Sequence, residues 1–501
     1  METQATERAP LRSWWAWLAM IVVVGGVLRL VPAPDAPLWG DEALSLVIAH
    51  FPATDLLFQP VDPSGGLYYL VQKAWLPFGT DPVVVRLPSI LFGTLTIVAA
   101  FALGAAARDA RTGLWCAAFF AVSPMLVVYA KEARTYALML FLLTTAAALT
   151  VHGFARQKDD GRWLVAALVT GVLALYAHPT AWLVIAPLAL FGFALRTRCR
   201  RGSLLQNTAF GAGAFILSLP ELRRLLLMRE TEQFSWLRQA NPIEIASYLM
   251  EIAFGWRASA DLLAFNLCLF IISVGAFAYL LVRREARGRS DITNYVLLTF
   301  LLIYPLLLYV VGGVTPIAML RTSLPFSIGF ALWFGLSIRT RMSSIAGAIF
   351  ILAIAANQLT NDQAHEKRDW RAIATMVNNI NPNIPLLICA DYLVPSYLLG
   401  DRTTSRDVYI SGNSALYRAR KTGEVGLGAA YIPYWRARVD KTAPRPEKVA
   451  PEIFSEALYL SVDCHPVLDA RVTENYGFER KADVDGYDNL GQPISISRLS
   501  R

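Results

Sequence analysis

Charged residues are scarce in this sequence. Only 17% of its 501 residues are Asp, Glu, Lys or Arg, whereas 55% are hydrophobic, and the mean hydropathy is positive. This composition excludes an ordinary soluble enzyme and is typical of a polytopic membrane protein. The long apolar runs end near residue 358, and a mixed composition follows. The sequence therefore predicts a transmembrane domain at 1–358 and a second domain at 359–501.

Cysteine and histidine are also few, with five of each. No spacing among them resembles a metal site. Cys116 and Cys268 fall within apolar runs and Cys199 in a basic turn, so only Cys389 and Cys464 share the second domain. Each of these two lies in or beside an apparent strand, which favours two buried free thiols over a disulfide.

About eleven runs are long and apolar enough to span a membrane as helices. The run at 204–220 is the weakest, because Gln206 and Asn207 lie near its start. The first run is too long for a signal-peptide core and no small-residue cleavage site follows it, so we expect an anchor. The predicted spans are 14–31, 83–105, 113–130, 135–153, 162–177, 180–195, 204–220, 261–282, 294–312, 318–338 and 343–357.

Basic residues lie mainly in alternate short connections, which is the pattern of cytoplasmic loops. The connections at 107–111, 155–162, 196–202, 283–289 and 339–341 carry fifteen Lys and Arg residues, whereas the first intervening loop has only Lys73. The longer connection at 221–260 adds five arginines, but long loops are weaker topology signals. We therefore expect a cytoplasmic N-terminus and a C-terminal domain outside the membrane, in the periplasm if the host is a bacterium. The net charge of +8 reflects this topology, and without a basic stripe it does not favour nucleic-acid binding.

The first outer loop, 32–82, is long and acidic. Its own apolar pattern predicts two short helices along the membrane surface. These helices would hold an acidic pair, Asp41 and Glu42, near the lipid headgroups. The acidic residues of the loop are Asp35, Asp41, Glu42, Asp55, Asp62 and Asp81.

Ionisable side chains from separate segments are expected on the same outer side. Such residues are costly near lipid and therefore suggest function. A carboxylate can deprotonate a hydroxyl nucleophile, and cationic side chains can stabilise a departing phosphate. A phosphate at this face is most naturally that of a lipid, so the pattern favours group transfer from a lipid phosphate. The residues are Arg86 in "VVVRLPS", the cluster Tyr129, Lys131, Glu132, Arg134 and Tyr136 in "YAKEARTYA", and Arg321 in "AMLRTSLP".

Residues 78–150 resemble the membrane glycosyltransferases of the dolichyl-phosphate-mannose protein mannosyltransferase type, which include bacterial aminoarabinose transferases. "WGDEA" is similar to the acidic pair of that family, "LYAHPTAW" to its aromatic-histidine step and "LRTSLPF" to its late Arg-x-x-x-Pro motif. The segment 369–400 is similar to the opening of the outer domain in many bacterial members. The resemblance implies a GT-C fold in a bacterial inner membrane.

The resemblance also implies inverting sugar transfer from a polyprenyl-phosphate donor to an unidentified acceptor. Asp41 would be the base that deprotonates the acceptor, and Glu42 would orient it or the substrate. The residues that would hold the donor phosphate are Arg86, Lys131, Arg134 and Arg321. The residues that would line the substrate site are Tyr68, Tyr69, Glu132, Tyr136 and His178.

One motif departs from the family pattern. Relatives have His/Asn-Pro-Pro before Leu-Tyr-Tyr, whereas this chain has "DPSGGLYY". Gly65 and Gly66 would make the backbone looser or let it approach a ligand more closely. The resemblance leaves open whether the acceptor differs or activity is reduced or lost. It implies no defined cofactor, although a divalent cation held by Asp35, Asp62 and Glu132 stays an alternative.

Each candidate residue also has an ordinary structural role. Asp41 and Glu42 could cap a helix, and the arginines at span ends could extend to the headgroups. Glu132 and Arg134 could pair with neighbouring charges. His178 precedes a proline, which favours a hydrogen-bonded turn over an acid or ligand. Beside the glycosyltransferase, a transporter of lipid-linked sugar or a binding protein that retained the fold therefore remain alternatives.

The second domain alternates helix-like and strand-like segments. Helices are predicted at 370–380 and 394–400, and strands at 385–391, 406–410, 457–463 and 494–499. This order predicts a small α/β layer. We interpret it as an acceptor-binding or cap module.

Overall fold

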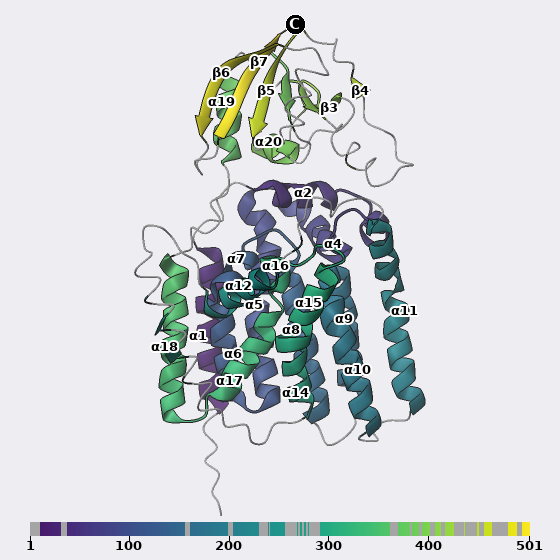
Figure 1. The fold of residues 1–501 in the computed structure, drawn as a ribbon, viewed down its shortest axis with the longest axis vertical. Helices are drawn as coiled ribbons and strands as arrows, with labels where there is room; N and C mark the ends of the chain where they lie inside the picture. The colour runs from purple at the N-terminus through teal and green to yellow at the C-terminus, as the bar shows by residue number, and fades with distance from the viewer. Residues whose placement is uncertain are drawn as a thin grey trace, which may run out of the picture. The chain divides into compact units, whose positions relative to one another are not determined.

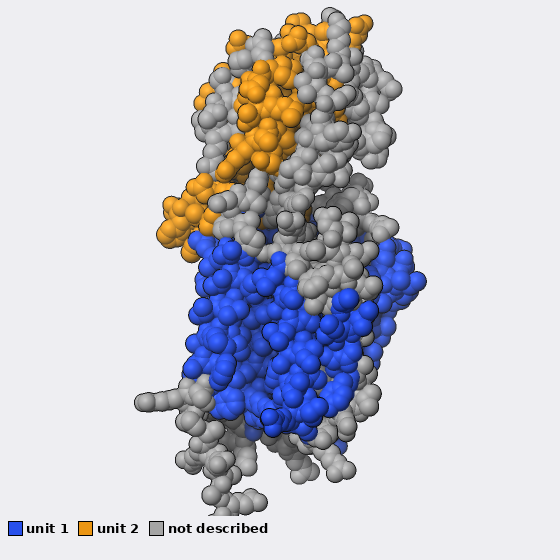
Figure 2. Space-filling model, turned by 90° about the vertical axis from the view of Figure 1, so that its left-hand side faces the viewer, with its two compact units in different colours: residues 1–34, 62–68, 86–364 blue, residues 35–61, 69–85, 365–501 orange. Residues whose placement is uncertain are grey.

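A computed structural model divides the chain into two compact units (Figures 1 and 2). Unit 1 comprises residues 1–34, 62–68 and 86–364, and unit 2 comprises residues 35–61, 69–85 and 365–501. The structure describes residues 11–31, 38–155, 161–198, 204–229, 239, 241–255, 268, 271–272, 275–276, 279, 291–360, 369–380, 383–389, 393–400, 406–411, 416–424, 435, 448–449, 455–462, 479–487 and 493–500.

Unit 1 is built of helices that run side by side (Figure 1). Most of the predicted span 261–282 lies outside the described residues, and each of the remaining predicted spans contains a helix. The elements are α1 (Leu11–Leu30), α5 (Pro82–Ala107), α6 (Ala110–Val122), α7 (Pro124–Ala130), α8 (Tyr136–Ala155), α9 (Gly161–Ala177), η2 (Pro179–Ala181), α10 (Trp182–Arg198), α11 (Leu204–Arg229), α12 (Pro242–Phe254), α14 (Asp291–Leu298), η4 (Thr299–Ile303), α15 (Tyr304–Gly312), α16 (Leu320–Ser323), α17 (Phe326–Ser337) and α18 (Arg341–Thr360).

Several of these helices have the length and composition of membrane spans. Among the described residues, five pass this test, and the bent pair α6–α7 makes a sixth if it is one span. The five are Pro82–Ala107, Tyr136–Ala155, Pro179–Arg198, Asp291–Gly312 and Arg341–Leu359. Further shorter apolar helices are Trp14–Leu30, Gly161–Ala177 and Phe326–Ser337. The prediction of a polytopic helical membrane protein is confirmed.

Helix α11 corrects one boundary. The sequence predicted a connection from residue 221, but α11 continues without interruption to Arg229. Pro220 lies within this helix, and the polar residues Glu221 and Arg224 follow it. The prediction of a loop at 221–229 is therefore wrong, because charged residues in a continuous helix were interpreted as a connection.

The bend between α6 and α7 depends on a buried arginine. The two helices meet at 63°, and Pro124 at the start of α7 has no N–H for the Phe120 carbonyl four residues earlier. The Arg29 guanidinium of α1 replaces that donor, with NH2 donating to Phe120 O at 2.8 Å and NH1 to Ala121 O at 3.2 Å and Gly25 O at 2.8 Å. Arg29 is only 2% exposed. A backbone group freed by proline is thus satisfied within the protein, as an apolar environment requires.

Unit 2 contains the helices of the first long loop. They are α2 (Gly40–Ala49), α3 (Ala53–Phe58), α4 (Gly66–Trp75), which begins in unit 1, and η1 (Leu76–Phe78). The sequence predicted two short helices here, and a break after Ala49 divides the first of them into α2 and α3. At the other end of the loop, the Trp75 indole donates to Val84 O at 2.9 Å and Gln72 to Val85 O at 2.8 Å.

The remainder of unit 2 is an α/β layer, as predicted. Its seven-stranded sheet has the order β4-β3-β2-β1-β5-β7-β6. The central strand β1 is apolar and buried, and it pairs parallel with β2 and β5, whereas the outer pairs are antiparallel. Helix α20 packs against both α19 and α2. The elements are α19 (Trp370–Asn379), β1 (Leu386–Ile388), α20 (Val394–Gly400), β2 (Val408–Ser411), β3 (Leu416–Arg420), β4 (Lys448–Val449), β5 (Glu456–Val462), β6 (Glu479–Tyr487) and β7 (Pro493–Ser500).

The cysteine prediction for this layer is wrong at Cys389. This residue follows β1 and is disulfide-bonded rather than a free thiol. Cys464 lies outside the described residues. A position beside a buried strand favoured a free thiol, but burial alone does not distinguish a thiol from a disulfide.

Replacing Arg29 with Met should destabilise the α6–α7 bend, because Phe120 O and Ala121 O would be left in an apolar environment without this donor. We expect the free energy of unfolding to fall by roughly 2–5 kcal/mol. Thermal melting of the purified protein in detergent measures this effect, with the exposed Arg223 of α11 changed to Met as the control. Equal melting temperatures for the two variants would contradict the assigned role.

Candidate functional site

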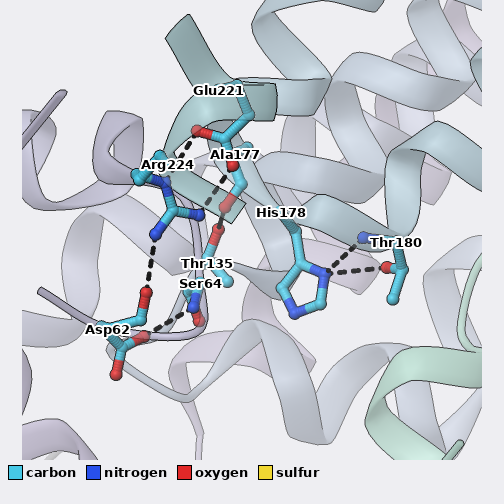
Figure 3. Close-up of polar contacts among 8 residues, drawn as sticks. All are labelled: Asp62, Ser64, Thr135, Ala177, His178, Thr180, Glu221 and Arg224. Atoms are coloured by element: carbon cyan, nitrogen blue, oxygen red, sulfur yellow. Dashed lines mark hydrogen bonds and ion pairs between the residues drawn. The ribbon is translucent and has the colours of Figure 1, made fainter. Parts of the chain in front are cut away.

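The candidate site is centred on a buried loop of unit 1, residues 62–65, which carries Asp62. The Asp62 carboxylate accepts a hydrogen bond from the Ser64 backbone N–H at 2.8 Å, a local turn typical of aspartate (Figure 3). The same Oδ1 atom lies 3.6 Å from NH2 of Arg134, and both side chains are almost fully buried. Asp62 and Arg134 thus form an ion pair between this loop and the α7–α8 connection.

The loop lies directly against the end of α9. The Gly65 backbone N–H donates to Ala177 O at 3.0 Å, and Thr135 Oγ1 donates to the same oxygen at 2.6 Å. A Cβ atom at Gly65 would lie 2.0 Å from Tyr176 O. Glycine therefore permits a close approach of two backbone segments here. Of the two interpretations that the sequence left open for Gly65, close approach holds, and the neighbour is the protein itself.

Further predicted tyrosine and arginine residues of unit 1 lie on the segments around Arg134. The Tyr68 hydroxyl lies 2.7 Å from Ser89 Oγ, which donates to Arg134 O at 3.2 Å. Arg86 is buried in α5 one helical turn before Ser89. The Arg321 guanidinium carbon of α16 lies 5.9 Å from the centre of the Tyr136 ring, within the range of a cation–π contact.

His178 occupies the turn between α9 and α10. Its Nδ1 atom accepts the Thr180 backbone N–H at 3.2 Å and lies 2.8 Å from Thr180 Oγ1 (Figure 3). The imidazole centre is 5.7 Å from that of Tyr136. This geometry is that of a residue that caps a helical turn, consistent with the structural alternative for His178.

The charged residues that affect the pKa of His178 define a single cluster in unit 1. The pKa of His178 is lowered to about 3, chiefly by burial and next by the positive charge of Arg134, while the Asp62 carboxylate acts in the opposite direction. Arg321 and Arg224 contribute smaller effects that also lower this pKa. His178 is therefore neutral at physiological pH. We call Asp62, Arg134, His178, Arg224 and Arg321 the unit 1 cluster.

Other predicted residues lie outside this cluster. Asp41 and Glu42 are in the first turn of α2, and Tyr69 follows in α4, all within unit 2. Glu42 is fully buried and its Oε2 accepts the Trp39 backbone N–H at 3.3 Å, so it caps the helix. Lys131 donates to Val31 O at 3.3 Å, at the end of α1.

Glu132 is buried in the α7–α8 connection, two residues before Arg134. Tyr129, at the end of α7, packs edge-on against Tyr136 with ring centres 5.5 Å apart. Sequence segment 129–136 therefore contributes two aromatic rings and one member of the unit 1 cluster, Arg134.

The acidic residues considered for a divalent cation do not fit one in the described part of the chain. Asp35 lies outside the described residues, and among those described no three His, Cys, Asp or Glu side chains gather as a metal site. The carboxylate of Asp62 faces a guanidinium group instead.

Two functional candidates were missed in the sequence. Glu221 and Arg224 form a fully buried ion pair on α11, and Arg224 also donates to the loop at Asp62 (Figure 3). A spacing of three residues between opposite charges is typical of one helix face. This signal was overlooked because the segment was interpreted as a connection.

Comparisons with known proteins agree with this architecture. Residues 67–221 match the family model described as dolichyl-phosphate-mannose-protein mannosyltransferase. The sequence has no match among curated proteins. The structure is similar to ArnT from Cupriavidus metallidurans in the apo state, with a TM-score of 0.59 and 12% identity over 97% of this chain and 98% of that chain. ArnT bound to undecaprenyl phosphate gives a TM-score of 0.56 and 13% identity, over 96% of this chain and 98% of that chain.

At these identities the structural likeness establishes the fold. A third structure, the apo oligosaccharyltransferase of Archaeoglobus fulgidus, covers 78% of this chain and 64% of its own at a TM-score of 0.48 and 12% identity, a score too low to carry an argument. The fold is the GT-C fold. The predicted fold class is confirmed.

Acid should destabilise the protein through His178. The pKa of its folded form, about 3, is below that of an unfolded histidine, near 6.5, so only the unfolded chain binds the proton between these values. The stabilising contribution is complete above pH 6.5 and falls as the pH decreases toward 3. By pH 5 the loss amounts to about 2 kcal/mol. The melting temperature should therefore fall more between pH 7.5 and 5 in the wild type than in His178→Asn, and equal falls would contradict this account.

Gly65→Ala should displace the loop from α9, because the added methyl group would overlap Tyr176 O. We expect a loss of roughly 1–3 kcal/mol in the free energy of unfolding, measured by thermal melting in detergent. Gly192→Ala in α10 is the control, since no atom lies within 4 Å of a Cβ built there. A Gly65→Ala variant as stable as this control would show that the close approach is not required.

Proposed function

We propose that this protein is an inverting glycosyltransferase that moves a sugar from a polyprenyl-phosphate donor to an acceptor on the outer face of the membrane. The observation that carries the proposal is the unit 1 cluster in a chain with the GT-C fold. Its guanidinium, carboxylate and imidazole side chains are buried except that of Arg321, which is half-buried. The family match supports transferase chemistry. A similar fold binds undecaprenyl phosphate in ArnT, which supports a lipid-linked donor.

Two arginines of the cluster, Arg134 and Arg321, would bind the donor phosphate. Arg134 and Arg321 both lie close enough to His178 to affect its pKa. In a site shielded from water, guanidinium groups stabilise the charge that develops on a departing phosphate. Of the other candidates, Arg86 is buried on the same helix as Ser89, whereas Lys131 contacts the end of α1. We therefore favour Arg134 and Arg321 for this role.

Asp41 would act as the general base. Its carboxylate would take the proton of the acceptor hydroxyl or amine, and the acceptor atom would bond to the anomeric carbon on the face opposite the phosphate. The bond between the anomeric carbon and the phosphate oxygen breaks, and its electron pair leaves on polyprenyl phosphate. Asp41 lies in the first turn of α2, where the helix dipole favours a negative charge.

The predicted membrane topology indicates the side of the membrane on which the reaction would take place. The distribution of Lys and Arg supports a cytoplasmic N-terminus and a C-terminal domain in the periplasm of a bacterial inner membrane. The α/β layer packs through α20 against α2, the helix that carries Asp41. This contact supports a role for the layer in holding the acceptor side of the reaction.

Asp41→Asn should abolish transfer while preserving the fold, because the amide keeps the shape of the side chain and cannot accept the proton. The measurement is the release of undecaprenyl phosphate from sugar-labelled undecaprenyl-phosphate mannose and aminoarabinose in membranes. We expect a fall of at least a hundredfold. Asp81→Asn, an exposed change in the same loop, is the control.

Full transfer by Asp41→Asn would exclude Asp41 as the base. Movement of labelled donor across vesicles by the wild type, without any glycosylated or hydrolysed product, would instead favour a transporter.

A further inference from the structure

We propose that Glu221 and Arg224 of α11 are positioning residues that hold the 62–65 loop so that Asp62 stays beside the phosphate-binding Arg134. The role of Arg134 rests on the proposed function, whereas the attachment of the loop can be tested independently of it. Glu221 and Arg224 would thus affect donor binding without contacting the reacting groups.

The pair leaves Arg224 little conformational freedom. Its Nε donates to Glu221 Oε2 at 2.8 Å and its NH2 to Glu221 Oε1 at 2.7 Å, a bidentate arrangement (Figure 3). Both side chains are 0% exposed. The planar guanidinium is thereby fixed on two sides, and its third nitrogen points in a defined direction.

That third nitrogen binds the loop. NH1 of Arg224 donates to the backbone carbonyl of Asp62 at 2.8 Å. The carboxylate of the same residue faces the other way, toward Arg134 at 3.6 Å. Asp62 is therefore held between two arginines from separate segments, through its backbone by Arg224 of α11 and through its side chain by Arg134 of the α7–α8 connection.

The helix that carries the pair, α11, is itself bonded to α9. The Tyr176 hydroxyl of α9 donates to Leu217 O of α11 at 2.9 Å, so the two helices are joined one turn before Glu221. The loop is also bonded to α9 through Gly65 and Ala177. Hydrogen bonds thus connect the 62–65 loop, α9 and α11 to one another.

Stability alone does not account for this arrangement. Burying an ion pair costs about as much in desolvation as the attraction returns, so such a pair is weak evidence for a gain in stability. The pair instead determines the position of the loop, because Glu221 orients Arg224 and Arg224 binds the Asp62 carbonyl. Without it, the loop would keep its bond to α9 at Gly65 but would lose the bond that fixes the Asp62 carbonyl.

The test is hydrogen exchange of the full-length protein in detergent without lipid. In Arg224→Gln, the amides of residues 62–68 should exchange at least tenfold faster, while those of α8 stay unchanged. Glu221→Gln should have a smaller effect in the same segment, since Arg224 remains but loses its orientation. The matched control is Arg223→Gln, the same chemical change at an exposed neighbour, which should resemble the wild type.

Donor binding gives the second readout. Affinity for undecaprenyl phosphate should fall about tenfold in both Arg224→Gln and Glu221→Gln, and not in Arg223→Gln. If Arg224→Gln does not fold, Arg224→Lys serves instead, because a single ammonium group cannot bind the carboxylate in two places and also reach Asp62 O.

Two results would overturn the proposal. Exchange of residues 62–68 at the wild-type rate in the Arg224 variants would show that the pair does not hold the loop. Loss of lipid affinity in Arg224→Gln alone, with loop exchange unchanged, would show that Arg224 contacts the phosphate directly. Failure of the wild type to transfer sugar would refute the proposed function, and loop exchange would still decide the role of the pair.

Discussion

Backbone carbonyls that helices leave without a donor must find one inside the protein wherever water is excluded. Three interruptions in unit 1 are resolved in this way. Arg29 binds Phe120 O at the α6–α7 bend, Thr135 binds Ala177 O at the end of α9, and Arg224 binds Asp62 O in the loop before α4. Each donor comes from a different segment of the chain, so the interruptions also fix the segments relative to one another within the unit.

The candidate site is a consequence of this constraint. Residues 131–135 and 62–65 are the irregular segments of unit 1 that carry Arg134 and Asp62, and their backbones are bonded to helices on either side. Irregular backbone allows the charged side chains of Asp62 and Arg134 to meet inside an apolar bundle, and the hydrogen bonds of these segments hold them in place. A GT-C scaffold can therefore present charged groups without losing the integrity of its helices.

Composition and periodicity predicted most of the fold from the sequence. Hydrophobic runs locate the helices well because an apolar environment demands long uncharged segments. The α/β layer was equally recognisable from its buried strands, although β3, β4 and β6 were missed, since each contains charged residues such as Arg418, Lys448 and Lys481 that obscure an apolar pattern. The site was less predictable. Arg134 and Arg321 were predicted as candidates from their positions at span ends and His178 from the family resemblance, but the hydrogen bond between Asp62 and Arg224 joins residues 162 positions apart, which no local pattern contains.

The central claim is that the unit 1 cluster binds the phosphate of a lipid-linked sugar donor. The most direct measurement is an experimental structure of the full-length protein with undecaprenyl phosphate. We expect the phosphate to lie within hydrogen-bond distance of the guanidinium groups of Arg134 or Arg321, with Asp62 still paired to Arg134. A phosphate bound elsewhere, with both guanidinium groups directed away from it, would contradict the account.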